Sequence, residues 1–336
     1  MGGNALKKHG IFTERKTTEE FQRIADEIQK QVAIDFNNKI DTSIVTCYHN
    51  KPTHGDLDIL VKTIDGFNIN FKNYIEDTFK PRAIHVNDGV YSFDYDNFQI
   101  DFNLIPEKYF KTANVYYSYD PIGNIMGKVY HKFGLSYGWK GLSYKFRNFN
   151  GRLTQDIIVS TDTRKIFEFA GYDYDRYLKG FDDLEDIFEF VINNPYFDTE
   201  VFQFNNLNRI DRKRNLRRHS YHLFLNYLNE NNINYRYDFK NKEDYLYDID
   251  DYFPESKLLN KIDSLYELDS RNQIIANKFN GDLIMSWIND LTGKELGIKI
   301  NEFKTELGDD FEWFILNSDE DTIRREFIKF YNNEFE

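Results

Sequence analysis

The pattern of apolar and polar positions predicts a helix near the start of the chain. Residues 17–32 place four apolar side chains at helical spacing, namely Phe21, Ile24, Ile28 and Val32. Thr17 precedes this run and acidic residues follow it, which is typical of a helix N-terminus. We therefore expect an amphipathic helix with one face against a core.

Two stretches rich in β-forming residues follow, at residues 42–61 and 90–105. Within the second, FQIDFNLIP (98–106) alternates apolar and polar residues, as a half-buried strand does. Residues 66–79 have the pattern of a helix that joins the strands. We predict a mixed or antiparallel sheet in this part of the chain.

Beyond Pro106 the chain is rich in glycine, which predicts mixed loops, and short helices are predicted at 164–173 and 184–198. The remainder is helical in pattern, with a polar, acidic interruption at 229–256 that predicts a long loop or insertion. The apolar residues of that interruption that could pack are Tyr247, Ile249 and Phe253. The fold class is therefore predicted to be α+β, with a mixed sheet followed by a helical C-terminal domain.

Composition adds limits to this picture. The chain has 336 residues, which favours two or three domains, and its 17% aromatic content predicts a core built on rings. It contains no apolar run of about 18 residues, as a membrane span requires. The start, MGGNALKKHGIF, has no apolar stretch of a signal peptide, so we expect a cytoplasmic protein that does not bind membranes. One cysteine, Cys47, excludes an intramolecular disulfide.

Charge is unevenly distributed along the chain. The net charge is −13, which argues against a nucleic-acid-binding surface overall, yet residues 206–222 hold six Arg and Lys against one acid. A basic helix over 209–218 would be either a solvated surface or a track for phosphates. Its basic residues are Arg209, Arg212, Lys213, Arg214, Arg217 and Arg218.

Two aspartates stand one residue apart where an apolar strand begins, in THGDLDILVK (53–62). Successive side chains of a strand point to opposite faces, so Asp56 and Asp58 lie side by side on one face. Two adjacent negative charges repel each other, and we expect a positive charge beside them.

A third aspartate, Asp101, lies inside the apolar strand 98–106. Desolvating an ionised carboxylate costs several kcal/mol, so Asp101 also needs a partner. If this strand pairs beside residues 57–61, three carboxylates meet at one point. Such a cluster suits Mg²⁺, and two ions about 3.5–4 Å apart would activate an attacking oxygen and stabilise a leaving one.

These residues resemble the DNA polymerase beta-like nucleotidyltransferase superfamily, in particular its family X polymerases. HGDLDILVK is similar to the Gly-Asp-h-Asp-h signature of that family. The resemblance covers roughly residues 42–198 and implies a polymerase beta-like palm. It also implies that Gly55 belongs to the nucleotide site, that Asp56 and Asp58 bind two Mg²⁺ ions, for which Mn²⁺ substitutes, and that Asp101 is the third ligand.

The stretch VYYSYDPIGN (115–124) extends the resemblance to the incoming nucleotide. By similarity to the family, Tyr116 and Tyr117 would lie against the sugar and Asn124 near the base. The family's Gly-Ser motif, which holds the triphosphate, is absent from residues 43–56. The candidates to replace it are the hydroxyl of Thr46, the charge of Lys51, His49 or His54, and a fold-back of Gly2 and Gly3.

Residues 278–304 are similar to the tail of bacterial-type tRNA nucleotidyltransferases, in which an Asn-Gly-Asp-Leu turn leads to a helix, a Gly-containing loop and another helix. This similarity and the basic segment favour RNA over DNA as the nucleic-acid partner.

The resemblance thus implies a Mg²⁺-dependent nucleotidyltransferase of EC 2.7.7 type. It would join a nucleotide from an NTP, or a dNTP, to the 3′-hydroxyl of RNA, with a tRNA-like 3′ end as the specific expectation. A small family X-like DNA polymerase and a non-catalytic nucleic-acid-binding module are the alternatives. We do not expect a zinc enzyme, a serine hydrolase or a P-loop NTPase.

Four segments are predicted on this basis. Residues 1–40 form an N-terminal helical segment and residues 41–106 the palm. Residues 107–198 form the nucleotide-binding subdomain, and residues 199–336 a helical C-terminal domain that binds nucleic acid.

Overall fold

The structure is a computed structural model of the chain, and it describes residues 3–64, 69–288 and 292–333. The chain divides into two compact units, which are described separately. The first consists of residues 1–145 and 156–258, and the second of residues 146–155 and 259–336. The predicted boundaries at residues 40, 106 and 198 fall within the first unit and stay predictions. None of the described helices is both long and apolar enough to cross a membrane.

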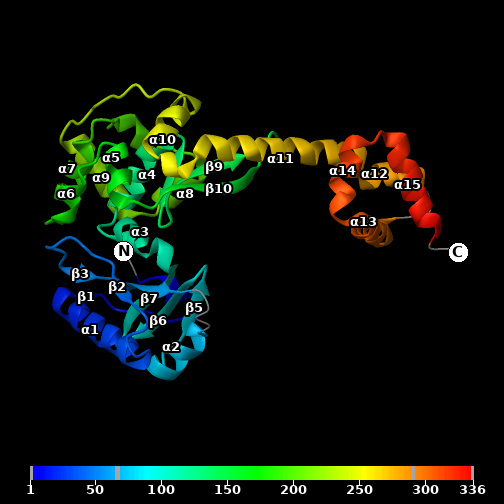
Figure 1. Cartoon of the computed structure of the whole chain (residues 1–336). Coiled ribbons are helices and arrows are strands. Elements are labelled where there is room, and N and C mark those ends of the chain that lie inside the picture. Colours follow the sequence, from blue (N-terminus) through cyan, green and yellow to red (C-terminus); the bar gives the residue numbers. More distant parts are fainter. Residues whose placement is uncertain (1–2, 65–68, 289–291, 334–336) are drawn as a thin grey trace. The chain divides into compact units, whose positions relative to one another are not determined.

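A five-stranded mixed sheet organises the N-terminal part of the first unit (Figure 1). Its strands in spatial order are β2 (Thr42–Ile44), β4 (Asp56–Thr63), β7 (Phe98–Pro106), β6 (Val90–Tyr95) and β5 (Ile84–Asn87). Strands β4 and β7 are parallel, and every other neighbouring pair is antiparallel. The prediction of a mixed sheet and of a strand over residues 98–106 is confirmed.

One face of this sheet is an apolar core. Because side chains alternate along a strand, every second residue of the central strands points into it. These residues include Leu57, Ile59, Val61, Phe93, Ile100 and Phe102, all fully buried. Helices α1 (Thr18–Asp35) and α2 (Phe71–Phe79) cover this face. The helix predicted over 66–79 is thus found from residue 71, and residues 66–68 lie outside the described residues.

Helix α1 begins where the pattern predicts. The Thr17 hydroxyl accepts a hydrogen bond from the N–H of Glu20 at 3.3 Å, and the N–H of Thr17 donates to the Glu20 carboxylate at 2.8 Å. This reciprocal capping satisfies two backbone donors of the first turn, which stabilises a helix by about 1 kcal/mol.

Helices α3 (Glu107–Tyr117) and α4 (Ile122–Lys132) occupy the stretch after Pro106, so the prediction of mixed loops there is wrong. Gly123 lies in α4, where a Cβ would be 2.4 Å from the carbonyl oxygen of Tyr116. The glycine therefore permits close contact between the two helices, and it marks packing rather than a loop.

The rest of the first unit includes two smaller sheets and a set of short helices. One sheet pairs β1 (Lys16–Thr17) with β3 (Thr53–His54). The other has the order β10-β9-β8, formed by β8 (Leu135–Gly138), β9 (Gly141–Arg147) and β10 (Leu153–Ser160). Residues 146–155, which comprise the end of β9, the turn after it and the start of β10, belong to the second unit. The helices are α5 (Thr163–Phe169), α6 (Tyr174–Leu178), α7 (Leu184–Ile192), α8 (Arg209–Asn215), α9 (His219–Glu230) and α10 (Leu246–Tyr252).

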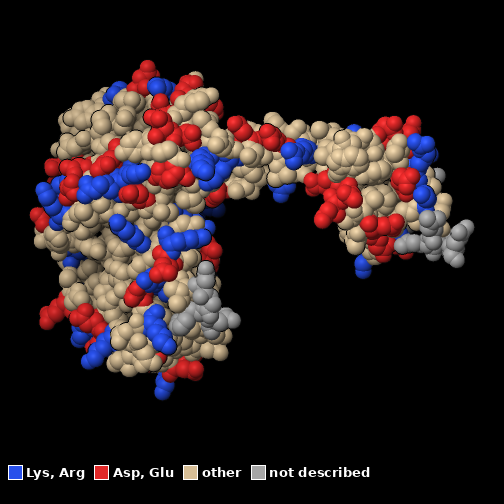
Figure 2. All heavy atoms as spheres, in the orientation of Figure 1, with Lys and Arg blue, Asp and Glu red and all other residues tan. Residues whose placement is uncertain are grey.

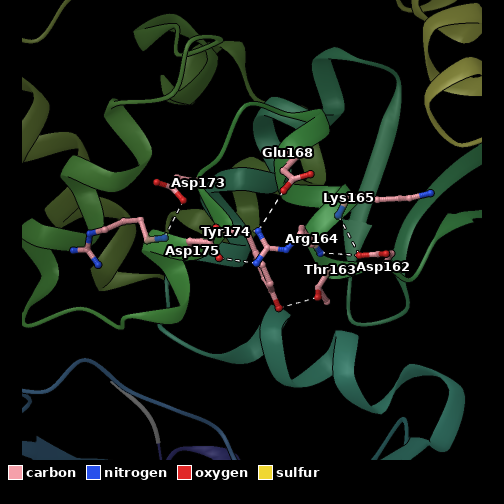
Figure 3. Close-up of polar contacts among 9 residues, drawn as sticks. Asp162, Thr163, Arg164, Lys165, Glu168, Asp173, Tyr174 and Asp175 are labelled. Atoms are coloured by element: carbon pink, nitrogen blue, oxygen red, sulfur yellow. Dashed lines mark hydrogen bonds and ion pairs between the residues drawn. The ribbon is translucent and has the colours of Figure 1, made fainter.

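Aspartate side chains cap the N-termini of the short helices α5 and α6 (Figure 3). Asp162 accepts hydrogen bonds from two backbone N–H groups at the start of α5, at 3.0 and 3.2 Å. Asp173 caps α6 by accepting one hydrogen bond, from the N–H of Arg176 at 2.9 Å. Arg164 then joins the two helices through both carboxylate oxygens of Asp175, at 2.6 and 3.1 Å. The predicted helices over 164–173 and 184–198 correspond to α5 and α7.

The acidic stretch 229–256 contains helical turns rather than one long loop, because α10 lies within it. Ile249, in α10, and Phe253, which directly follows the helix, are both fully buried. Tyr247 is 75% exposed, so the expectation that it could pack is wrong.

The second unit is a bundle of helices with a core of aromatic rings. Its helices are α11 (Leu258–Lys278), α12 (Gly281–Trp287), α13 (Gly293–Leu307), α14 (Phe311–Asn317) and α15 (Glu320–Asn333). Phe303 packs on Phe279 and Phe327, with ring centroids 5.6 and 5.1 Å apart. The turn, helix, loop and helix predicted over 278–304 correspond to α12 and α13, and residues 289–291 lie outside the described residues.

Candidate active site

The second face of the five-stranded sheet is polar, and it brings the three aspartates together. In the parallel pair of β4 and β7, Asp58 is the register partner of Asp101, and Asp56 is the partner of Gln99. Register partners on neighbouring strands are about 4.8 Å apart at the backbone and point to the same face. All three carboxylates therefore project from one face, as the sequence predicts.

Each of these carboxylates accepts hydrogen bonds from neutral groups. The N–H of Gly3 donates to Asp56 at 3.0 Å, and the amide of Asn103 donates to Asp58 at 3.2 Å. The amide of Gln99 donates to both oxygens of Asp101, at 3.0 Å each. Sequence reasoning missed Gln99 and Asn103, although the alternation of the strand 98–106 places both on the face of Asp101.

The protonation of the cluster reflects burial and like charge. Asp101 is 9% exposed, and burial, followed by the charge of Asp56, raises the pKa of its carboxyl to about 6. Burial, followed by the charges of Asp56 and Asp101, raises the pKa of Asp58 well above its usual value. The neutral partners offset only part of the repulsion, so the cluster favours a proton or a cation.

The chemistry of these donors fits a hard divalent cation, because Mg²⁺ prefers carboxylate oxygens. Among the residues that the structure describes, however, no group of three or more His, Cys, Asp and Glu side chains is arranged so that it could hold a metal ion. The carboxylates bond to the amides of Gly3, Gln99 and Asn103 instead. The assignment of Asp56, Asp58 and Asp101 as ligands of two ions stays a prediction.

A short N-terminal segment, residues 3–9, contacts the polar face. Besides the bond from Gly3 to Asp56, the N–H of Ala5 donates to the side-chain oxygen of Gln99 at 2.9 Å. Leu6 is fully buried and anchors the segment. Gly3 has a φ of +78°, and a Cβ there would lie 2.3 Å from the carbonyl oxygen of Gly55. Only glycine fits this approach.

The fold-back expected of the first residues is thus found for Gly3, while Gly2 lies outside the described residues. The contact of Gly3 is with an aspartate, and its role toward a triphosphate stays a prediction.

The loop between β2 and β4 holds the other residues predicted to contact a triphosphate. Its backbone at Thr46 is fixed by α3 and the turn after it, because the Thr46 N–H donates to the Ser118 hydroxyl at 3.2 Å and its carbonyl accepts from Tyr119 at 2.7 Å. The side chain of Thr46 is exposed, and the charge of Lys51 is close enough to lower the pKa of Asp58, a smaller effect than burial and the two other aspartates.

The two histidines of this loop have structural partners. His54 is 3% exposed and stacks on Phe21 with ring centroids 4.0 Å apart. Burial is the main reason why the pKa of His54 falls to about 4, so it is neutral at pH 7 and does not supply the expected charge. His49 Nδ1 lies 2.9 Å from a carboxylate oxygen of Asp182. Of the three candidates, Lys51 and His49 therefore remain.

Tyr116 and Tyr117 end α3 beside the polar face. Burial, followed by the charges of Tyr116 and Asp58, raises the pKa of Tyr117 to about 12, and Arg214 opposes this. The charges of Asp58 and of Arg214, in α8, thus both act on the pKa of Tyr117. Asn124 is 9% exposed in α4, and its amide donates to the Asn215 side chain at 2.9 Å. The nucleotide contacts of these three residues stay predictions.

The basic segment is not one helix over 209–218, so that expectation is wrong. Helix α8 ends at Asn215, and Arg218 has an extended backbone, with φ −95° and ψ 108°, before α9 begins. The side chain of Asn215 is fully buried against α4, which fixes the end of α8 and turns the chain.

The six basic residues differ in their surroundings. Arg212 donates to the carbonyl oxygens of Phe204, Asn205 and Leu207 and supports that turn. Arg218 lies 3.5 Å from a carboxylate oxygen of Asp120. The exposed ones besides Arg212 are Arg209, Lys213, Arg214 and Arg217. Figure 2 shows Lys and Arg interspersed with Asp and Glu on one face of the first unit, so the positive charge there is local.

A serine hydrolase is not supported, although GLSYG (134–138) has the G-x-S-x-G spacing. Ser136 lies in β8, which pairs with β9 in an antiparallel hairpin. A nucleophilic serine of that motif sits on a sharp turn from a strand to a helix.

Comparisons with known proteins add little to this geometry. No family model matches the chain, and no curated protein matches it. Among solved structures, the ternary gap complex of polymerase beta from Leishmania infantum is similar, with a TM-score of 0.34 and 14% identity over 40% of this chain. The ternary P/T complex of the same polymerase has a TM-score of 0.34 and 13% identity over 42% of this chain. The matches span 52% and 62% of those chains. Likeness at this level decides neither family nor activity.

Proposed function

We propose that this protein is a Mg²⁺-dependent nucleotidyltransferase of EC 2.7.7 type that adds nucleotides to the 3′-hydroxyl of RNA. The proposal rests on the register of β4 and β7, which puts Asp56, Asp58 and Asp101 on one face of the sheet. Three like charges are stable together only if something offsets them, and divalent ions that carry a nucleoside triphosphate do this.

In the proposed reaction the 3′ oxygen of the acceptor bonds to the α-phosphorus of the nucleotide. The bond from that phosphorus to the diphosphate breaks, and diphosphate leaves. Asp101 orients the hydroxyl and accepts its proton. Bound Mg²⁺ would lower the pKa of the hydroxyl and offset the charge of the triphosphate. Asp56 and Asp58 are the shared ligands, and the amide of Asn103 holds Asp58 in place.

The nucleotide lies between the aspartates and α3 in this proposal. The proximity of Tyr117 to the aspartates is supported by its pKa, which the charge of Asp58 helps to raise. Thr46 and Lys51 face the triphosphate from the loop before β4. The full set of proposed nucleotide contacts is Thr46, Lys51, Gly55, Tyr116, Tyr117 and Asn124.

The acceptor is proposed to be RNA with a tRNA-like 3′ end. Arg214 supports a route for its backbone, because Arg214 and Asp58 both act on the pKa of Tyr117. Exposed arginines and lysines contact phosphates without reading sequence, so affinity should fall steeply with salt. Arg212 has a structural task in addition, since it supports the turn at 204–207.

The test is a transfer assay with the full chain. Each labelled NTP and dNTP is incubated with Mg²⁺ and with tRNA, single-stranded RNA or primed DNA, and product lengths are read on a gel. We expect labelled RNA, no product in EDTA, and less than about a tenth of the wild-type turnover for Asp101→Asn. The matched control is Asp26→Asn, on the exposed side of α1.

The same assay separates the alternatives. Extension of primed DNA that follows the template would favour a DNA polymerase and contradict the RNA proposal. If no acceptor is labelled and nucleic acid alone raises the melting temperature, the protein is a binding module.

A further inference from the structure

A cavity of about 360 Å³ opens beside Asp101 on the polar face of the sheet. One wall is the N-terminal segment, with Asn4 and Lys8, and the other is the hairpin of β5 and β6, with His85, Asn87 and Ser92. Ser92 is the register partner of Asp101, so both side chains project from the same face of the sheet. The cavity therefore borders the aspartate cluster at Ser92.

Lys8 is the one Lys or Arg among the residues that line this cavity. Its Nζ lies 2.7 Å from Nε2 of His85, and burial, followed by the charge of Lys8, lowers the pKa of His85, so the histidine is a neutral neighbour of the lysine at pH 7. None of the residues that line the cavity is an Asp or Glu, in a chain with a net charge of −13. Asn4, Asn87 and Ser92 add neutral donors. Such a lining suits an anion that accepts several hydrogen bonds.

The order of the strands separates this cavity from the loop proposed to hold the triphosphate. That loop connects β2 to β4, whereas the cavity lies over β6 and β5. Asp101, on β7, stands between them in the order β2-β4-β7-β6-β5. Two phosphate-bearing ligands can therefore approach the cluster from opposite sides.

We propose that this cavity binds a phosphodiester group next to the 3′ end of the acceptor strand and thereby places the terminal hydroxyl at Asp101. The inference rests on the proposed function and adds the place at which the acceptor binds. Its volume lies within the usual range for small-ligand sites, about 300–1,000 Å³. Lys8 supplies the charge for the phosphodiester, and the neutral side chains around it complete its hydrogen bonds.

The test measures RNA binding without turnover. Full-length protein is titrated into a fluorescein-labelled single-stranded RNA of 12 nucleotides, in Mg²⁺ and without NTP. We expect Lys8→Gln to weaken binding about 5-fold and to reduce the salt slope by about 0.7, the loss of one phosphate contact on a single strand. Lys8→Arg should restore most of the affinity. The control is Lys7→Gln, a neighbouring exposed lysine that does not line the cavity.

A modified RNA locates the contact. With an uncharged methylphosphonate at the last linkage, wild-type protein should lose about the same 5-fold, and Lys8→Gln should lose nothing further, because both changes remove one interaction. A methylphosphonate in the middle of the strand should leave the effect of Lys8→Gln intact.

Equal effects of Lys8→Gln and Lys7→Gln would overturn the inference, since charge alone would then explain them. A rise in the KM for NTP in Lys8→Gln, with unchanged RNA affinity, would also overturn the inference. The phosphate bound in the cavity would then belong to the nucleotide. These outcomes are independent of the proposed function, whose failure would appear as no nucleotide transfer by wild-type protein.

Discussion

The two faces of the five-stranded sheet use the same strands for opposite purposes. On one face, Ile59 of β4 and Phe102 of β7 are fully buried in a core that α1 and α2 cover. On the other, Asp58 and Asp101 are register partners and accept hydrogen bonds from neighbouring amides. Residues adjacent in sequence thus have opposite effects. Those on the apolar face stabilise the fold, and the aspartates on the polar face repel one another.

This difference shows where function is concentrated. The apolar face lowers the free energy of the folded state by burial, roughly 25 cal/mol per Å². The polar face holds two carboxyls whose pKa values are raised by burial and like charge, which is unfavourable for folding at neutral pH. Clustered carboxyls with raised pKa values are typical of functional sites, where a bound cation would offset the repulsion.

The most direct test of the difference between the two faces changes one residue on each of them. Asp58→Asn should lower turnover about 10³-fold, several kcal/mol in the transition state, because a proposed metal ligand is lost. It should not lower stability, since it removes a repelling charge. Turnover in the transfer assay and the midpoint of urea unfolding measure the two effects.

Ile59→Ala is the matched control from the next position of the same strand. It should destabilise the protein by about 2–5 kcal/mol through the cavity that it leaves. Turnover per folded molecule should stay near the wild-type value. If Ile59→Ala reduced turnover as strongly as Asp58→Asn, the division of tasks between the two faces would be wrong.

The pH dependence of stability is a second test of the difference between the two faces, and its expected effect is smaller. The pKa of Asp101 is about 6 in the folded protein, against an ordinary value near 4. Between these values the folded state holds a proton that the unfolded chain releases, so the free energy of unfolding falls as pH rises from about 4 to 6. The cost at pH 7.5 is about 3 kcal/mol without metal ions.

Asp101→Asn removes this term, so in EDTA the variant should be more stable than wild type at pH 7.5 and equal to it at pH 4. Urea unfolding at both pH values measures the difference. Addition of Mg²⁺ should stabilise wild type more than the variant. A difference that does not change with pH would show that Asp101 ionises normally in the folded protein.

Much of this arrangement could be predicted from the sequence, because alternation along a strand is a local property. The pattern of residues 98–106 gives both the strand and the face on which Asp101 lies, and the same holds for Asp56 and Asp58. The prediction that the three carboxylates meet assumed that β4 pairs with β7. That pairing depends on contacts between distant parts of the chain, so a local pattern does not give it.

The errors have the same origin. The glycines after Pro106 predict loops when read locally, but Gly123 is needed for contact between α3 and α4. The run of basic residues at 209–218 predicts one helix, but burial of Asn215 against α4 ends it. In each case a contact between two helices overrides the local pattern. The hydrogen bond of Gly3 to Asp56 is likewise invisible to a local pattern.

The smallest expected effect concerns that contact. In Gly3→Ala the new Cβ would lie 2.3 Å from the carbonyl oxygen of Gly55, so the segment must shift and the bond to Asp56 is lost. We expect turnover to fall about 10-fold, the equivalent of one hydrogen bond to a charged group, with a smaller change in stability. Turnover and urea unfolding of the purified variant measure both.

Gly10→Ala is the control that distinguishes a disturbed aspartate site from backbone strain as the cause of lost turnover in Gly3→Ala. Gly10 also has a positive φ, +75°, but no atom lies within 4 Å of the position of its Cβ. Both substitutions therefore strain the backbone, and only Gly3→Ala disturbs the aspartates. Turnover should be normal in Gly10→Ala. If both variants lost turnover equally, backbone strain would explain the loss, and the N-terminal segment would have no specific role in positioning Asp56.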